Sequence, residues 1–288
     1  MTSQSRFDTL AIIGVGLLGG SVAKAAKARG LVHRVIGIGR NAEKLVSAQT
    51  AGVIDTYRMD LQDLSDADLI VVCTPVDRLA EDIIAAAQHT PGHAVITDVG
   101  STKGMIVDQV SAHPVATKKY VPAHPLAGSE QTGWRAGSAD LLQDRLCVLT
   151  PFDGIDPSRL SQIDLFWRAL GMQTRQLSPR DHDRVLALTS HLPHVVAAAL
   201  ASLVGEAERP FAATGFRDTT RIAAGDPTVW TPILMQNSDA ILTAIDRIVS
   251  EVDTLKSALQ ADDAAEVTRW LTRGQHRRNA LLQPSDER

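Results

Sequence analysis

Four short segments of the chain concentrate side chains that can move protons or hold anions. They occupy residues 98–103 (DVGSTK), 122–130 (PAHPLAGSE), 182–194 and 215–230. Imidazole groups suit acid–base work near neutral pH, and a guanidinium group clasps a carboxylate with two parallel hydrogen bonds. These residue types therefore indicate acid–base chemistry on a substrate that carries a carboxylate.

The first two segments hold the candidate base. Pro125 forces His124 into an extended backbone, and a histidine held at a strand end is positioned for proton transfer. Ser101 stands where an expected strand passes into an expected helix, either as a helix cap or as a site residue. A purely structural histidine is the alternative interpretation for His124.

The third segment predicts a cluster on one helix. At 100° per residue, Asp183 and His194 lie on nearly one face, with His191 one turn before His194. Pro193 removes an N–H and is expected to kink this helix. Packing or a zinc site are the alternatives. The two-residue gap between the histidines differs from HExxH and no third soft ligand is evident, so no metal is expected.

The fourth segment offers a group for binding an anion. Arg221 can grip a carboxylate, and Trp230, nine residues later, can form the wall of an apolar pocket. A loop salt bridge between Arg217 and Asp218, worth little when exposed, is the alternative.

The N-terminal segment is typical of a dinucleotide site. An apolar run over residues 9–13 leads into GxGxxG, whose glycines allow the tight turn, the approach of a pyrophosphate and close helix packing. Free N–H groups at the start of the next helix attract phosphates. The candidate cofactor contacts here are Gly14, Gly16, Leu17, Leu18 and Gly19.

Residue 40 bears on the choice of nucleotide. Many NAD sites place Asp or Glu at the end of the second strand, where it binds the ribose hydroxyls. This chain has Arg40 there, and an arginine pairs with a 2′-phosphate that an acid would repel. The sequence therefore favours NADP over NAD. Stacking on adenine or a solvent position is the alternative for Arg40.

Composition excludes other classes of protein. The net charge of -4 gives no basic field for nucleic acid. The apolar stretch at 195–204 is too short to cross a bilayer and no signal-peptide pattern starts the chain, so we expect a cytoplasmic protein without a membrane partner. Cys73 and Cys147 lie in apolar runs and are expected to be buried thiols.

The pattern of elements predicts two domains. Residues 1–177 alternate short apolar runs with amphipathic segments, which is typical of an α/β fold with a Rossmann-type parallel sheet. In residues 178–288 the strand-like runs stop, which predicts an all-helical domain whose apolar faces pack internally or across a homodimer. The expected strands are 9–13, 34–38, 69–73, 94–98, 120–123, 146–150 and 172–177. The expected helices are 42–50, 76–88, 103–111, 181–206, 229–259 and 262–282.

These motifs, taken in order, resemble the prephenate/arogenate (cyclohexadienyl) dehydrogenase family of tyrosine biosynthesis. The likeness covers GLLGGS, CTPV at 73–76, DVGSTK, AHPLAGSE, HD with SHLPH, and FRDTTRIA with its downstream tryptophan. It spans almost the whole chain and implies a Rossmann domain followed by a helical dimerisation domain.

The resemblance also implies a reaction and a set of roles. Hydride leaves the hydroxyl-bearing ring carbon for a nicotinamide and the ring carboxylate departs as carbon dioxide, with no metal. His124 matches the histidine that accepts the hydroxyl proton, Ser101 the serine that assists it, and Arg221 the arginine that binds a substrate carboxylate. Further matched substrate positions are Ser129, Asp183, His191, His194 and Trp230. Further matched cofactor positions are Thr74, Pro75, Val76 and Gly100.

Two other functions are compatible with the same outline. A β-hydroxyacid dehydrogenase depends on a lysine in the helical half, where this chain has only Lys256, outside the four segments. A nonenzymatic NAD(P)-sensing protein would keep the glycine turn without needing His124, Ser101 and Arg221 together.

Overall fold

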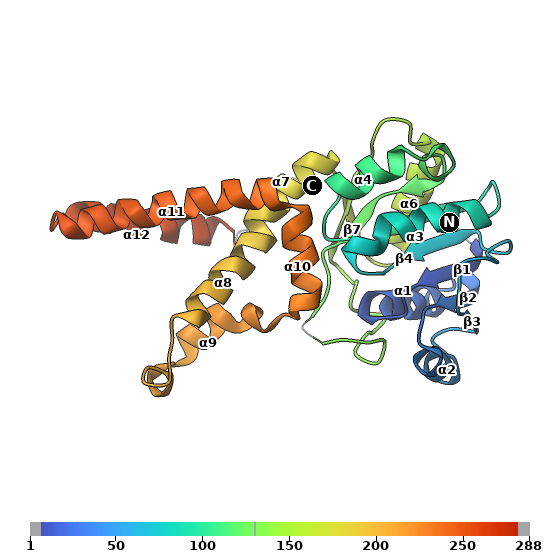
Figure 1. Ribbon diagram of the computed structural model, residues 1–288, viewed down its shortest axis with the longest axis horizontal. Coiled ribbons are helices and arrows are strands. Elements are labelled where there is room, and N and C mark those ends of the chain that lie inside the picture. The colour runs from blue at the N-terminus through green and yellow to red at the C-terminus, as the bar shows by residue number, and fades with distance from the viewer. Residues whose placement is uncertain (1–6, 130, 282–288) are drawn as a thin grey trace. The chain divides into compact units, whose positions relative to one another are not determined.

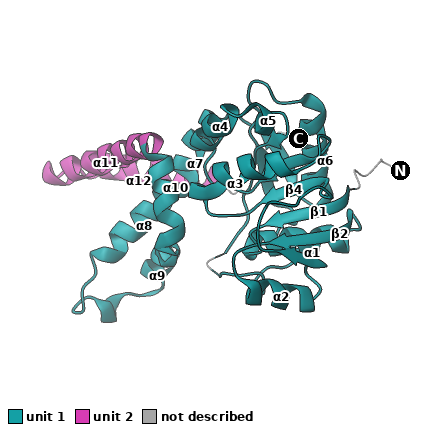
Figure 2. Ribbon diagram, turned by 45° about the vertical axis from the view of Figure 1, so that its right-hand side comes forward, with its two compact units in different colours: residues 1–238 teal, residues 239–288 magenta. Residues whose placement is uncertain are grey.

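The computed structural model describes residues 7–129 and 131–281. The chain forms two compact units that divide after Ser238, and Figure 2 colours them separately. The first unit holds every strand and the helices up to α10, and the second holds most of α11 and all of α12. The last strand ends at Gln176, so helices α7 to α10 belong to the same compact unit as the sheets. The domain boundary at 177/178 stays a prediction.

The centre of the first unit is a six-stranded parallel sheet in the order β3-β2-β1-β4-β5-β6 (Figure 1). Its four central strands are buried almost throughout, as expected of a parallel sheet covered on both faces. The predicted Rossmann-type fold is therefore confirmed. The strands are β1 Phe7–Ile13, β2 Val32–Ile38, β3 Thr56–Arg58, β4 Leu69–Val72, β5 Val95–Asp98 and β6 Tyr120–Val121.

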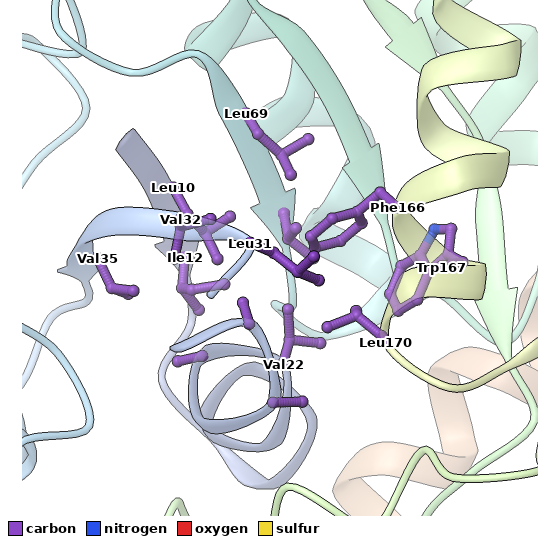
Figure 3. Packing of buried hydrophobic residues seen from close by; sticks show 14 of the residues in the cluster. Leu10, Ile12, Val22, Leu31, Val32, Val35, Leu69, Phe166, Trp167 and Leu170 are labelled. Carbon is purple, nitrogen blue, oxygen red and sulfur yellow. The ribbon is translucent and has the colours of Figure 1, made fainter. Parts of the chain in front are cut away.

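Helices cover both faces of this sheet, and each face has its own core. Side chains alternate along β1, so Leu10 and Ile12 pack in one core while Ala11 and Ile13 pack in the other. Figure 3 shows Phe166 of α6 reaching toward Leu31 in the first core. The helices are α1 Leu17–Ala28, α2 Ala42–Thr50, α3 Val76–His89, α4 Gly104–Ser111, α5 Pro114–Thr117 and α6 Pro157–Ala169.

The expectation of one sheet is wrong. The segment 120–123 is not a single strand, because Pro122 has no N–H with which to continue the ladder of β6. The chain instead enters a second, three-stranded sheet in the order β7-β8-β9, with β7 antiparallel to β8. Its strands are β7 Ala123–Pro125, β8 Leu146–Leu149 and β9 Gln173–Gln176.

The edge strand β3 escapes sequence reasoning because it has only three residues and none of them is buried. By contrast, α2 has the predicted bounds, and the Asn41 side chain accepts a hydrogen bond from the N–H of Lys44 at 2.9 Å. Strong capping chemistry thus fixes a helix end that hydrophobic periodicity alone leaves open.

The predicted helix over 181–206 is interrupted. It consists of α7 Pro179–Leu186, a π-helical turn Ala187–His191 and α8 Leu192–Ser202. Pro193 has no N–H to bond the preceding turn, and the wider π turn occurs directly before it. The sequence therefore located the irregularity but not its form.

The helical stretch Pro179–Ser202 has 24 residues, and its most apolar 18-residue window has a mean hydropathy of 1.5, enough by length and composition to cross a membrane. This is weak evidence for a membrane span, because the stretch carries His182, Asp183, His191 and His194, all buried within the protein. The cytoplasmic location stays a prediction.

The remaining helical segments differ from the predicted ones in one important place. The expected helix 229–259 is broken at Asn237, which ends α10.

In the second unit α12 pairs with α11, and the Trp270 indole donates to the carbonyl of Glu251 at 3.1 Å. Residue 282, the predicted end of the last helix, lies outside the described residues. The segments are 3₁₀ Arg209–Phe211, α9 Thr214–Thr220, 3₁₀ Arg221–Ala224, α10 Pro227–Gln236, α11 Ser238–Gln260 and α12 Ala264–Ala280.

Candidate active site

The glycine turn between β1 and α1 has the shape of a phosphate cradle. Gly14 has φ +94°, and a Cβ there would lie 2.8 Å from the carbonyl oxygen of Cys73. A Cβ on Gly19 would collide with the carbonyl of Gly14, whereas one on Gly16 would meet nothing. Gly16 is also the N-cap of α1 and supplies no side-chain cap, so the first N–H groups of the helix stay free for an anion.

A cavity of about 680 Å³ opens beside this turn. Arg40, exposed at the end of β2, lines it together with Asn41 and Lys44. On the other side lies Thr74, whose buried hydroxyl has no hydrogen-bond partner within residues 7–129 and 131–281. Predicted cofactor residues in the cavity wall are Gly14, Gly16, Arg40, Thr74 and Pro75. Predicted cofactor residues outside it are Leu17, Leu18, Gly19, Val76 and Gly100.

The buried carboxylate of Asp98 connects the end of β5 to the segment that carries His124. It accepts hydrogen bonds from the N–H of Gly100 and the hydroxyl of Tyr120, both at 2.9 Å, and from the N–H of Ala123 at 3.0 Å. It also forms an ion pair with the equally buried Lys103. Since removing one partner leaves the other charge buried and unpaired, this pair holds the loop firmly.

Ser101 lies half-buried in that loop and does not cap a helix. Helix α4 begins at Gly104, and its first N–H groups are bonded by Asp183 instead. The capping alternative for Ser101 is therefore wrong. No hydrogen bond involving the Ser101 hydroxyl occurs among the residues that the structure describes.

Two imidazoles and a carboxylate form a buried chain of hydrogen bonds. Nδ1 of His124 lies 2.9 Å from Nε2 of His182, and Nδ1 of His182 lies 2.7 Å from Oδ1 of Asp183. His182 is fully buried and His124 is 8% exposed. Nε2 of His124 has no hydrogen-bond partner in the described part of the chain.

Asp183 anchors this chain to the start of α4. Its Oδ1 also accepts from the N–H of Lys103 at 2.8 Å, and its Oδ2 accepts from the N–H of Gly104 at 2.7 Å. A Cβ at Gly104 would stand 2.9 Å from Oδ2, so the glycine permits this approach. Although the resemblance implies a substrate role for Asp183, its carboxylate is engaged by the N–H groups of Lys103 and Gly104 and by His182.

Burial lowers the pKa of every histidine in this region. For His124 burial holds the pKa well below its usual range, and repulsion from His182, Lys103 and His191 when these are protonated lowers it further. For His182 burial lowers the pKa although the hydrogen bond to Asp183 works in the opposite direction. Both imidazoles are therefore neutral at neutral pH, and a neutral imidazole can accept a proton.

His191 is oriented by a residue from the break between α10 and α11. Nδ2 of Asn237 lies 2.8 Å from the carbonyl oxygen of Asp183 and 3.1 Å from Nδ1 of His191. Since a carbonyl only accepts, this atom is the amide nitrogen, and Nδ1 of His191 must accept its second hydrogen. The proton of His191 is thus on Nε2, which is buried without a partner among residues 7–129 and 131–281.

His194 and Trp230 form an aromatic wall. Their rings stack 3.6 Å apart at 9°, and His191 meets the same tryptophan edge-on at 6.3 Å. The backbone of Gly225 passes close by, since a Cβ there would lie 2.5 Å from the indole nitrogen. The structure therefore brings together three of the predicted substrate residues.

Arg221 and Ser129 are held less firmly. Arg221 is exposed at the start of a 3₁₀ turn, and its guanidinium bonds no other described residue. Its neighbour Arg217 donates to the carbonyl of Ala212 at 3.1 Å, so the alternative of a salt bridge to Asp218 is not observed. Ser129 is exposed beyond β7, where its hydroxyl accepts from the N–H of Gln131 at 3.2 Å.

Sequence reasoning missed three residues of this site. His182 was visible as the neighbour of Asp183, but one helical residue earlier it falls outside the face assigned to the cluster. Lys103 lies within DVGSTK, but a lysine is ordinarily expected to be exposed to solvent, and this one is buried. Asn237 had only one signal, the preference of asparagine for helix ends, inside what looked like a continuous helix.

A dinucleotide cradle followed by a buried, neutral imidazole with a free nitrogen defines a nicotinamide-dependent dehydrogenase. The model for "Prephenate dehydrogenase, nucleotide-binding domain" matches residues 22–175, and that for "Prephenate dehydrogenase, dimerization domain" matches residues 178–273. The chain belongs to the prephenate dehydrogenase family, whose members are NAD-dependent oxidoreductases that also decarboxylate.

Individual relatives agree with this assignment. The chain is 34% identical to prephenate dehydrogenase of Bacillus subtilis strain 168, over 95% of this chain and 76% of that protein. It is 33% identical to cyclohexadienyl dehydrogenase of Zymomonas mobilis, over 98% and 99%. It is also similar to the crystal structure of prephenate dehydrogenase from A. aeolicus in complex with hydroxyphenyl propionate and NAD+, with TM-score 0.90 and 29% identity over 95% and 98% of the two chains.

Proposed function

We propose that this chain oxidises and decarboxylates prephenate, arogenate or both, with His124 as the proton acceptor. The observation that carries this assignment is the free Nε2 of a neutral, buried imidazole at the end of the segment that Asp98 ties to β5. A bound nicotinamide supplies the hydride acceptor. His124 takes the hydroxyl proton, so the electron pair of the O–H bond can form a carbonyl as hydride leaves the ring carbon.

The decarboxylation needs no further acid or base from the protein. Once the ring is a dienone, it accepts the electrons of the bond to the departing carboxylate and becomes aromatic. The chain's task at this stage is to hold the ring in place and exclude water. Trp230 and His194 offer the flat wall for this, and Arg221 offers the cation for a carboxylate that stays on the substrate.

Ser101 assists in this proposal by hydrogen-bonding the hydroxyl that His124 deprotonates. Its hydroxyl is half-buried and no described residue bonds it, so it can both donate and accept. Among the other positions that resemblance assigns to the substrate, His191 supplies an N–H through Nε2. Ser129 is exposed, and its role stays a prediction.

The decisive experiment is a paired assay of prephenate and arogenate, each with NAD and with NADP, followed by nicotinamide absorbance and carbon dioxide release. We expect reduction of the cofactor and one carbon dioxide per turnover with at least one of the two acids. A 3-hydroxyacyl substrate serves as the comparison for the β-hydroxyacid alternative. Turnover of that compound but of neither ring acid would contradict the proposal.

We also infer a preference for NADP over NAD. Arg40 and Lys44 line the cavity at the end of β2, where NAD sites commonly carry an acid. Arg40→Asp should shift the ratio of kcat/KM values toward NAD by about tenfold or more, since it replaces an attraction for the 2′-phosphate by a repulsion. Arg209→Asp, an equal charge change at an exposed residue outside the cavity, is the control. An unchanged ratio of the kcat/KM values for NADP and NAD in Arg40→Asp would show that Arg40 does not bind this phosphate.

We infer a homodimer formed through the helical part of the chain. Helix α11 exposes Leu242, Val249, Val252 and Leu259, each at least 50% accessible and spaced seven, three and seven residues apart. Such spacing lines one face of a helix and suits a second copy. Sedimentation should give a dimer for the native chain and a monomer for Leu242→Glu with Val249→Glu, while Ser250→Glu should remain dimeric. A monomeric native chain would contradict this inference.

A further inference from the structure

The hydrogen bonds behind His124 fix which of its nitrogens carries a proton. The carboxylate of Asp183 accepts from two backbone N–H groups, which can only donate, so it is an acceptor toward His182 as well. Nδ1 of His182 therefore carries its proton. In a neutral ring Nε2 is then the acceptor, and Nδ1 of His124 must donate to it across 2.9 Å.

This order of donors and acceptors leaves a lone pair on Nε2 of His124, the nitrogen without a partner among the described residues. The tautomer of His124 is therefore set by a chain of hydrogen bonds. The backbone N–H groups at the start of α4 make Asp183 an acceptor, Asp183 fixes the tautomer of His182, and His182 fixes that of His124. We propose that His182 is a positioning residue that also takes up the proton charge when His124 acts as the base. This inference rests on the proposed function.

The proton balance of the step is simple. The substrate O–H bond breaks and an N–H bond forms at Nε2 of His124. At the same time the proton on Nδ1 of His124 moves to Nε2 of His182, so that His124 is again neutral and His182 becomes an imidazolium. The positive charge then lies 2.7 Å from the carboxylate of Asp183 instead of on a ring that lacks a carboxylate partner.

The surroundings explain why the positive charge is more stable on His182 than on His124. Burial and repulsion from protonated His182, from Lys103 and from protonated His191 disfavour a proton on His124. Burial also lowers the pKa of His182 and Lys103 acts in the same direction, but here the hydrogen bond to Asp183 and the charges of Asp183 and Asp98 oppose them. Lys103 is itself paired with Asp98, which reduces its effect on both rings. A buried base can therefore work here because its proton is shared with the ring beside Asp183.

The tautomers can be tested without any substrate. With the full chain carrying ¹⁵N-labelled histidine, two-bond ¹H–¹⁵N spectra at neutral pH distinguish a protonated from an unprotonated ring nitrogen. Among the nine histidines, the signals of His124 and His182 are identified by their loss in His124→Asn and His182→Gln. We expect both His124 and His182 to be protonated on Nδ1. A His124 protonated on Nε2 would overturn the proposal whatever the enzyme oxidises.

The charge uptake is tested by kinetics. A glutamine at position 182 can still accept from His124 and donate to Asp183, but it cannot hold a proton. We expect His182→Gln to lower kcat by about 10- to 100-fold, and to move the acid limb of the kcat/KM profile by roughly one pH unit to lower pH, with cofactor affinity unchanged. His33→Gln, at a histidine whose side chain is 72% exposed, is the matched control.

The two outcomes separate the proposals. If His182→Gln lowers kcat without moving the acid limb, His182 only supports the structure and charge uptake is wrong. Circular dichroism and the melting temperature show whether the variant is folded, and His182→Asn gives a second, shorter amide if it is not. If the tautomers are as expected but neither prephenate nor arogenate is oxidised, the proposed substrate is wrong, while the positioning of His124 by His182 stands.

Discussion

The residues assigned to proton transfer and those assigned to anion binding, here called the buried wall and the exposed wall of the candidate site, are held in different ways. In the buried wall His124, His182 and Asp183 are buried and joined by hydrogen bonds that end on the backbone of α4. In the exposed wall Arg221 is exposed, and Trp230 is half-buried against His194. The wall assigned to proton transfer is complete before any ligand binds, whereas the wall assigned to anion binding lacks its partner.

This difference follows from what each wall must do. A base contributes to the rate only if its orientation and protonation state are fixed before the transition state, so its supporting groups must be rigid. A cation that grips a carboxylate gains its partner on binding, and an exposed guanidinium keeps its hydration until then. Variants on the two walls should therefore affect different kinetic constants.

The largest effect is expected on the buried wall. His124→Asn should lower kcat by about 10²- to 10⁴-fold, because it removes the proton acceptor, while the Kd for the cofactor stays near its native value. Rapid-quench kinetics and cofactor titration give the two constants, with His33→Asn as the control. Native turnover in His124→Asn would place the base elsewhere.

The buried wall should also make the stability of the fold depend on pH. Burial lowers the pKa of His191 from 6.5 to about 4, and the pKa values of His124, His182 and His194 are lowered as well. Below pH 6.5 the unfolded chain then binds more protons than the folded one, so stability falls as pH decreases. For His191 alone the loss between pH 6.5 and 4 is about 3 kcal/mol.

Urea unfolding at several pH values measures this loss. His191→Gln should remove part of the slope between pH 6.5 and 4, whereas His113→Gln, at an exposed histidine for which no ion pair occurs among the described residues, should leave it as it is. A free energy of unfolding that is constant over this range would mean that these imidazoles are protonated in the folded protein.

The same contrast explains which parts of the molecule the sequence predicts. The glycine turn, the central strands and the choice of His124 as candidate base follow from short-range rules that act on a few adjacent residues. Arg221 and Trp230 also stand out, because a cation and a large aromatic side chain in a polar loop segment have few structural uses. These predictions needed no knowledge of distant contacts.

The supporting residues were not predictable in this way. Asp183 bonds backbone groups some 80 positions earlier in the chain, and Asn237 reaches back 54 positions to the carbonyl of Asp183. No local sequence pattern around either residue predicts these contacts. The break at Asn237 has the same origin, since its amide bonds Asp183 and His191 within a segment whose local pattern predicts a continuous helix.

On the exposed wall, Arg221→Ala should raise KM by about 10- to 100-fold and leave kcat within a few-fold of native, because a charge-assisted pair is worth about 1.5–3 kcal/mol. Arg221→Lys keeps a point charge without the fork and should recover part of the loss. Arg217→Ala is the neighbouring control. A fall in kcat with unchanged KM would assign Arg221 to the chemical step and erase the distinction between the walls.

The smallest effect is expected at the aromatic edge of the same wall. A substrate ring packed against the aromatic wall of Trp230 and His194 gains about 0.5–1.5 kcal/mol beyond its buried area, so Trp230→Leu should raise KM about two- to tenfold and Trp230→Phe less. Steady-state kinetics on both variants measure this order. If Trp230→Leu instead lowers kcat as strongly as His124→Asn does, the aromatic wall aligns the reacting carbon, and anion binding and proton transfer are not separable in this site.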